Sequence, residues 1–145
     1  MTAPVLQESQ IRAEGTATTK MEAMREAHEI LVEAGAVTAD YLPAMIEREK
    51  TVSTYMGNFL AIPHGTNDAK EAIKASALSF VRYSTPIDWD GNPVRFVVGI
   101  AGIENQHLDI LSKIAIVFSD DDQVQALTDA TDESAIYAIL SEVNE

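Results

Sequence analysis

The sequence contains no cysteine among its 145 residues. Disulfides, thiolate metal ligands and a cysteine nucleophile are therefore excluded. Basic residues are also few, because 10 Lys and Arg stand against 23 Asp and Glu, for a formal net charge of −13 at pH 7. This charge repels phosphate backbones, so we expect no nucleic-acid partner, and it favours encounter with a protein that presents a basic face.

The N-terminal segment lacks an unbroken apolar stretch. Glu8, Arg12 and Glu14 interrupt residues 1–15, so this segment is neither a signal-peptide core nor a membrane span. We therefore expect a cytoplasmic protein without direct membrane insertion. The length fits one domain, and the apolar share of 46% is that of an ordinary globular chain, so residues 1–145 are predicted to form a single domain.

Apolar residues at helical spacing predict several helices. The first runs over 19–34, with Thr19 and Glu22 placed as a capping box. The second begins after Asp40, whose side chain is expected to cap it. The predicted helices cover residues 19–34, 41–50, 68–74, 106–118, 122–130 and 133–143.

Short apolar runs between these helices predict strands. They cover residues 59–62, 77–81, 87–89 and 94–100. Asp90, Gly91, Asn92 and Pro93 are typical turn residues, so the last two strands are expected to form a hairpin. Helices alternating with such strands predict an α/β fold in which a mixed β-sheet is flanked by helices on both faces.

Two histidines follow predicted strands. His64 comes directly after 59–62, and His107 follows 94–100. If these strands are parallel neighbours, the two imidazoles meet at one edge of the sheet, where ligand sites of such folds collect. The third histidine, His28, lies between acidic residues of the first helix, and we assign it to a solvated face.

Histidine suits phosphoryl transfer, because its ordinary pKa of about 6.5 leaves a neutral ring nitrogen able to attack phosphorus at pH 7. His64 is the candidate acceptor, although a structural histidine in a turn is an equal alternative. Arg48 and His107 are the candidate donors to a phosphoryl group. Their alternatives are a helix-end cation and a surface histidine, respectively.

Four segments in order carry a family resemblance. They are Met45-Ile46-Glu47-Arg48-Glu49, Thr54-Tyr55-Met56-Gly57 and Ala61-Ile62-Pro63-His64-Gly65-Thr66, followed by Glu104-Asn105-Gln106-His107-Leu108. Together they resemble the enzyme IIA components of the bacterial sugar phosphotransferase system (PTS), in the mannitol and fructose class. The likeness extends over about residues 20–143.

The resemblance implies a phosphoryl relay. The phosphocarrier protein HPr would phosphorylate His64 as a tele-phosphohistidine, and His64 would pass the group to a cysteine of a cognate IIB domain, with the IIC permease component elsewhere. Arg48 and His107 match family positions that stabilise the phosphoryl group. No metal and no cofactor is implied.

Two positions bear on the branch of the family. Tyr55 and the segment Pro63-His64-Gly65-Thr66 look like the mannitol branch, so mannitol or a related sugar is expected. Asn58 departs from that branch, in which an acidic residue can occupy this position. Around His64 we expect an apolar partner surface with contributions from Met56 and Phe59, although for Phe59 packing in the core is the stronger expectation.

Two other functions remain open from the sequence. One is a regulatory module akin to the nitrogen-regulatory IIA proteins, in which the phosphorylation state of His64 controls partner binding. The other is a metal hydrolase with His64, His107 and a carboxylate such as Glu104 or Asp109 as ligands.

Overall fold

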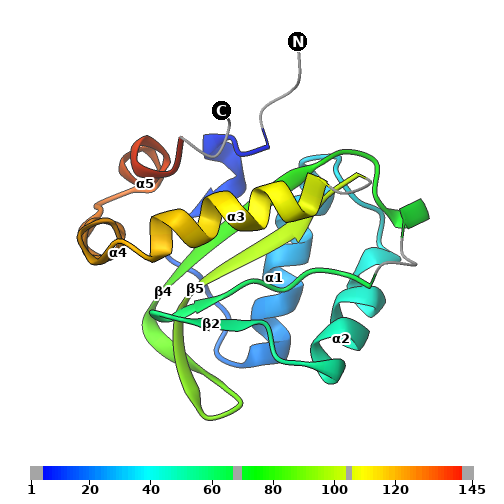
Figure 1. The fold of residues 1–145 in the computed structure, drawn as a ribbon, viewed down its shortest axis with the longest axis horizontal. Coiled ribbons are helices and arrows are strands. Elements are labelled where there is room, and N and C mark those ends of the chain that lie inside the picture. Colours follow the sequence, from blue (N-terminus) through cyan, green and yellow to red (C-terminus); the bar gives the residue numbers. More distant parts are fainter. Residues whose placement is uncertain (1–4, 67–69, 104–105, 142–145) are drawn as a thin grey trace.

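A five-stranded mixed sheet runs through the molecule with helices on both faces, as the sequence predicts (Figure 1). The computed structural model describes residues 5–66, 70–103 and 106–141. Its α-helices are α1 (Lys20–Glu33), α2 (Tyr41–Thr51), α3 (Gln106–Phe118), α4 (Asp121–Asp129) and α5 (Glu133–Leu140). Its strands are β1 (Ile11–Arg12), β2 (Tyr55–Gly57), β3 (Leu60–Ala61), β4 (Ala77–Trp89) and β5 (Asn92–Ala101). Two short 3₁₀ turns, η1 (Glu8–Gln10) and η2 (Lys70–Ala72), complete the elements.

The strand order is β1-β4-β5-β3-β2. β4 and β5 form an antiparallel hairpin, β1 lies parallel to β4, and β3 lies parallel to β5. β4 is one long strand where the sequence predicts two short ones. The pairing changes register between Arg82 and Ile87, and the intervening Pro86 is exposed, so the polar stretch that reads as a break is an irregularity within one strand.

Both faces of the sheet are apolar, because successive side chains of a strand point to opposite sides. On β5, Val97 belongs to the core shared with α1 and α2. Its neighbours Phe96 and Val98 belong to the core shared with α3, α4 and α5. The central strands are therefore buried from both sides, which fixes the position of the chain segments that leave their ends.

The first helix begins where the capping box predicts. The Glu22 N–H donates to Thr19 Oγ1 at 3.2 Å. The expected side-chain cap at Asp40 is wrong, since this side chain makes no capping hydrogen bond and Tyr41 N–H donates instead to the carbonyl of Thr38 at 3.1 Å. A backbone hydrogen bond therefore replaces the expected side-chain cap.

Two residues differ from the prediction in their exposure to solvent. His28 is buried, with 7% of its surface exposed, and its Nε2 lies 3.2 Å from the carbonyl oxygen of Thr38. The segment that follows α1 folds back over this helix and covers His28. Phe59 is 42% exposed instead of packed in the core, because it stands in a left-handed turn, with φ of 65°, before β3 begins.

Parts of two predicted helices fall outside the described residues. Of the helix expected over 68–74, the described part contains only the 3₁₀ turn η2 (Lys70–Ala72). The last helix ends at Leu140, and residues 142 and 143 of its predicted range lie beyond the described chain. β2 (Tyr55–Gly57) was not predicted, and it pairs antiparallel with β3 at the edge of the sheet.

Candidate functional site

His64 stands at the carboxyl end of β3, directly beside the end of β5. It pairs with Ile100 in a parallel bridge, and the Ile100 N–H donates to the carbonyl of Pro63 at 3.1 Å. The strands that precede His64 and His107 are thus parallel neighbours, which meets the condition that the sequence left open. Both histidines follow strands that end at the same edge of the sheet.

One ring nitrogen of His64 is occupied by the backbone. Nδ1 lies 2.8 Å from the carbonyl oxygen of Ile62. Because a carbonyl oxygen only accepts hydrogen bonds, Nδ1 carries the proton in this contact. The neutral imidazole then has its lone pair on Nε2, which is the nitrogen available as a nucleophile.

The surroundings of His64 lower its pKa below the ordinary value of 6.5. Burial of the ring is the largest cause, since it disfavours the charged form. The hydrogen bond to Ile62 and the charge of Glu49 raise the pKa, whereas the positive charges of Arg48 and His107 lower it. The lowered pKa favours the neutral ring, and both Arg48 and His107 interact electrostatically with it.

Arg48 lies in the last turn of α2 and is half-buried. Its Nη1 donates to the carbonyl of Val52 at 2.9 Å, just past the helix end. Arg48 is therefore a helix-end cation that binds a carbonyl, and its charge also acts on His64.

His107 is the second residue of α3, on the segment that follows β5. The backbone of Gly102 lies very close to the backbone of His107, because a Cβ added to Gly102 would lie 2.3 Å from the His107 nitrogen. The Ile103 N–H donates to Ser76 Oγ at 3.0 Å, which ties the same segment to the chain before β4. The backbone around His107 is thus fixed by a glycine contact and by a side-chain hydrogen bond.

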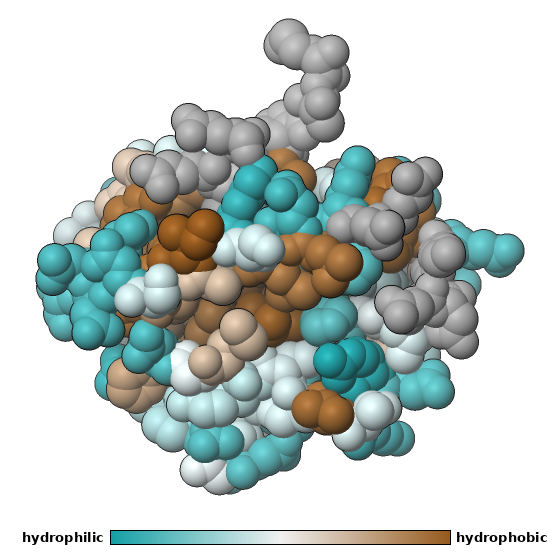
Figure 2. Space-filling view, in the orientation of Figure 1, coloured by the Kyte–Doolittle hydropathy of each residue, from teal (hydrophilic) through white to brown (hydrophobic). Residues whose placement is uncertain are grey.

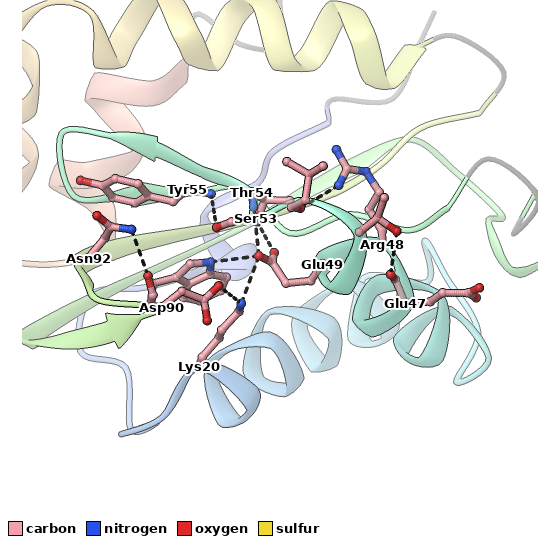
Figure 3. Close-up of polar contacts among 12 residues, drawn as sticks. Lys20, Glu47, Arg48, Glu49, Ser53, Thr54, Tyr55, Asp90 and Asn92 are labelled. Atoms are coloured by element: carbon pink, nitrogen blue, oxygen red, sulfur yellow. Dashed lines mark hydrogen bonds and ion pairs between the residues drawn. The ribbon is translucent and has the colours of Figure 1, made fainter.

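A buried carboxylate next to Arg48 joins several elements (Figure 3). Glu49 accepts hydrogen bonds from the N–H and the hydroxyl of Thr54 and from Trp89 Nε1, the last at 3.3 Å. Lys20 at the start of α1 lies 3.2 Å from Glu49 and 2.6 Å from Asp90 of the hairpin. This network holds the end of α2, and with it the backbone that carries Arg48.

The Glu49 network continues toward His64 through the backbone. Ile62 N–H donates to the carbonyl of Thr54 at 3.1 Å, and the carbonyl of Ile62 accepts from His64 Nδ1. Sequence reasoning did not identify Glu49 as part of the site's support. Arg48, Glu49 and Thr54 all belong to the segments that carry the resemblance, but the pairing of Glu49 with Thr54 exists only in the folded chain.

Asn58 lies away from His64. Its Nδ2 donates to the carbonyl of Phe118, the last residue of α3, at 2.6 Å. His107 stands at the other end of that helix, about 16 Å away for a rise of about 1.5 Å per residue. With φ of 49°, Asn58 also occupies the left-handed turn between β2 and β3, a conformation that asparagine tolerates well. Asn58, the residue that departs from the mannitol branch, therefore has a structural role in this turn.

Within the described ranges, no three His, Asp or Glu side chains gather in a way that could hold a metal ion. Glu104, one of the carboxylates considered as a ligand, lies outside those ranges. Asp109 pairs with Lys113 on α3, with 3.2 Å between carboxylate and ammonium. In the same part of the chain no helix is long and apolar enough to cross a membrane.

Comparison with known proteins identifies the family. The model of the family described as "Phosphoenolpyruvate-dependent sugar phosphotransferase system, EIIA 2" matches residues 4–143. The chain belongs to this family. It is therefore a phosphotransferase component of the IIA type, as the resemblance predicts.

The relatives of this IIA protein agree in name and fold. The mannitol-specific phosphotransferase enzyme IIA component of Halalkalibacterium halodurans is 46% identical over 145 residues, which is 100% of each chain. IIAMtl in the complex of IIAMtl with phosphorylated IIBMtl from Escherichia coli has a TM-score of 0.88 at 30% identity, covering 94% of this chain and 97% of that one. The nitrogen regulatory protein IIA-Ntr from Neisseria meningitidis has a TM-score of 0.82 at 29% identity, covering 94% and 96%.

Proposed function

We propose that this IIA protein carries a phosphoryl group on Nε2 of His64, takes it from phosphorylated HPr and donates it to the cysteine of a cognate IIB component. The observation that carries the proposal is the hydrogen bond from His64 Nδ1 to the Ile62 carbonyl, because it leaves the lone pair on Nε2. We further propose that the protein acts in the cytoplasm, where it serves a IIC permease through IIB.

The chemistry is an in-line transfer between histidine nitrogens, followed by a transfer from nitrogen to sulfur. A bond forms from His64 Nε2 to phosphorus while the bond from phosphorus to the donor histidine of HPr breaks. In the second transfer the thiolate of IIB attacks phosphorus, and the lone pair returns to Nε2. Each step needs a neutral His64 before or after phosphorylation, and burial together with Arg48 lowers the pKa of His64 and favours that state.

Arg48 and His107 supply positive charge and hydrogen-bond donors around the phosphoryl group in this proposal. A phosphoryl group adds close to two negative charges to a chain that already carries −13. The Coulomb interactions of His64 with Arg48 and His107 support their placement near the acceptor nitrogen. No metal or small cofactor takes part.

An exposed apolar face provides a docking surface for the partners. Met56, Leu108 and Ile116 are 52%, 55% and 66% exposed, respectively, and with the exposed Phe59 they lie on β2, the turn that follows it, and α3. Figure 2 shows apolar surface gathered over α3 and beside it, with hydrophilic residues around it. The net charge of −13 on the chain suits partners that present a basic rim to this face.

Mannitol or a related sugar alcohol is the proposed substrate of the whole transport system. The relatives from Halalkalibacterium halodurans and Bacillus subtilis, 46% and 43% identical, are named mannitol-specific. Tyr55 and the Pro63-His64-Gly65-Thr66 segment also favour this branch. Asn58, which departs from that branch, lies in the turn between β2 and β3, and its side chain binds the carbonyl of Phe118 at the end of α3.

A regulatory role like that of the nitrogen-regulatory IIA proteins is the second candidate. It is favoured by the similarity in fold to IIA-Ntr from Neisseria meningitidis. The genes beside this one distinguish the two functions, because a sugar carrier is expected next to a permease and a polyol dehydrogenase. The higher identity to mannitol-specific proteins makes the carrier the better-supported function.

The test of the proposed function is intact-protein mass after incubation with phosphoenolpyruvate, enzyme I and HPr. We expect one acid-labile phosphoryl increment on the wild-type chain and none on His64→Ala. His28→Ala is a matched control, because it removes another buried imidazole, and it should be labelled fully. Full labelling of His64→Ala would reject His64 as the acceptor.

A further inference from the structure

A buried tyrosine hydroxyl lies directly beside the His64 segment. Tyr41, the first residue of α2, is 2% exposed. Its hydroxyl donates to the carbonyl of Ile100 at 2.8 Å and accepts from the Gly65 N–H, also at 2.8 Å. One phenol therefore connects α2, the residue after His64 and the end of β5.

These two partners are the groups that continue a parallel ladder. His64 pairs with Ile100, and the Ile100 N–H already donates to the Pro63 carbonyl. In a regular parallel ladder the next hydrogen bond runs from the Gly65 N–H to the Ile100 carbonyl. The Tyr41 hydroxyl binds both groups, so a side chain from α2 completes the pairing directly after His64.

Gly65 fits this arrangement for a steric reason. A Cβ on Gly65 would lie 2.5 Å from Cε1 of Tyr41 and 2.9 Å from Cζ, so the ring of Tyr41 occupies the space of a side chain. Unusual backbone angles are not the reason, since Gly65 is not among the glycines with positive φ. The Gly65 N–H is also committed to Tyr41.

We propose that Tyr41 is a positioning residue for phosphoryl transfer: its hydroxyl fixes the backbone of His64 against β5 and so sets the place of Nε2 relative to Arg48 and His107. This inference rests on His64 being the acceptor. Tyr41 begins the helix that carries Arg48, and it binds the strand that leads to His107. It thereby joins the three segments that bear the proposed site residues.

The Tyr41 hydroxyl keeps its proton and can therefore make both hydrogen bonds at once. Burial raises the pKa of Tyr41 above 10.0, so the phenol keeps its proton at any pH at which the protein works. It can therefore donate to Ile100 and accept from Gly65 at the same time. Loss of the hydroxyl removes both hydrogen bonds, so the part-buried N–H of Gly65 and the buried carbonyl of Ile100 need other partners, and the backbone beside His64 shifts as they find them.

Tyr41→Phe tests the proposal, because it removes the hydroxyl and keeps the ring. We expect kcat for transfer from phosphorylated HPr to fall on the order of tenfold to a hundredfold, with KM for HPr nearly unchanged. Tyr83→Phe is the matched control: Tyr83 is also 2% exposed, and its hydroxyl donates to Glu26 at 2.6 Å on another part of the fold. The control should retain the wild-type kcat.

Imidazole NMR of the unphosphorylated proteins separates positioning from general destabilisation. The ¹H–¹⁵N signals of His64 should shift in Tyr41→Phe and stay in place in Tyr83→Phe. If both variants match the wild type in kcat and in the His64 signals, the hydroxyl of Tyr41 has only a structural role. Should Tyr41→Phe fail to fold, Gly65→Ala provides the second test, since it displaces the same ring, and normal transfer by that variant would also reject the proposal.

Failure of the proposed function has a different signature. In that case the wild-type phosphoryl group is found on a residue other than His64, whatever the two tyrosine variants do. Failure of the positioning role leaves the label on His64 and leaves its rate of transfer independent of the Tyr41 hydroxyl.

Discussion

At the scale of single residues, a backbone hydrogen bond sets the tautomer of His64 and the surroundings of its ring set its pKa. The hydrogen bond to Ile62 selects the tautomer, and burial lowers the pKa. The nearby charge of Arg48 lowers the pKa further, so the same residue that faces the phosphoryl group in our proposal also keeps the free acceptor neutral.

We predict that His64 titrates below pH 6.5 in the wild-type protein and at a higher pH in Arg48→Gln. Removing the positive charge relieves its repulsion of the imidazolium and raises the pKa of His64. An NMR titration of the His64 ring nitrogens measures both values. Arg25→Gln, which removes the same charge from an exposed position on α1, is the control and should titrate like the wild type. Equal titration of Arg48→Gln and wild type would contradict the prediction.

The lowered pKa of His64 also affects stability. Because the pKa is lower in the folded protein than in the unfolded chain, the unfolded chain binds the proton more strongly. The contribution of His64 to stability is therefore complete above about pH 6.5 and is lost as the pH falls through the folded-state pKa.

At the scale of elements, the start of α3 is set by the end of β5. Gly102 touches the backbone of His107 so closely that a methyl group has no room between them, and Ser76 binds the N–H of Ile103. The position of His107 is thus determined by the packing of the segment that follows the strand, in addition to the helix that contains it.

Gly102→Ala should displace His107. The added Cβ would meet backbone atoms of His107 at 2.3 and 2.6 Å, so the first turn of α3 must move, with a loss of stability of about 1–3 kcal/mol. We expect this variant to behave like His107→Ala: it accepts the phosphoryl group on His64 to some extent but transfers it slowly to IIB. Thermal unfolding and single-turnover transfer measure the two effects.

A control on a glycine that has open space completes this comparison. Gly91 of the hairpin has no atom within 4 Å of an added Cβ, but its φ of 94° makes alanine strained there. Gly91→Ala should therefore lose stability as Gly102→Ala does, while it keeps wild-type transfer. Slow transfer in both variants would show that instability alone is responsible.

At the scale of the whole molecule, the net charge of the protein affects how fast it meets its partner proteins. The chain carries a net charge of −13 and exposes apolar residues on α3 and β2, so long-range attraction brings a basic partner to the molecule and apolar contact completes the complex. Exposed charges act over a distance that salt shortens, to about 10 Å at 0.1 M ionic strength.

We predict that salt weakens productive encounter without slowing chemistry. Between low and high KCl, kcat/KM for phosphorylation by HPr should fall about tenfold while kcat stays constant, since screening reduces association rates. Steady-state kinetics with HPr as the varied substrate measures both constants, and sucrose at equal viscosity controls for diffusion. A salt-independent kcat/KM would exclude electrostatic steering.

The sequence by itself determined the elements and the chemistry available to them. Apolar spacing predicted α1, α2 and the sheet between helical layers, because burial of one face depends on local periodicity. The absence of cysteine excluded a cysteine nucleophile, and the segments that contain Arg48, His64 and His107 carry the family resemblance that implies phosphoryl transfer. These properties are carried by residue type and by neighbours along the chain.

Only the tertiary structure decided how those residues are held. The burial of His28, the continuity of β4 through Pro86 and the contact from Asn58 to Phe118 depend on chain segments that meet after folding. The Tyr41 hydroxyl likewise binds residues 24 and 59 positions away. Hydrogen bonds across such separations leave no periodic pattern in the sequence, because the partner of each group is fixed by packing of the sheet and its helices.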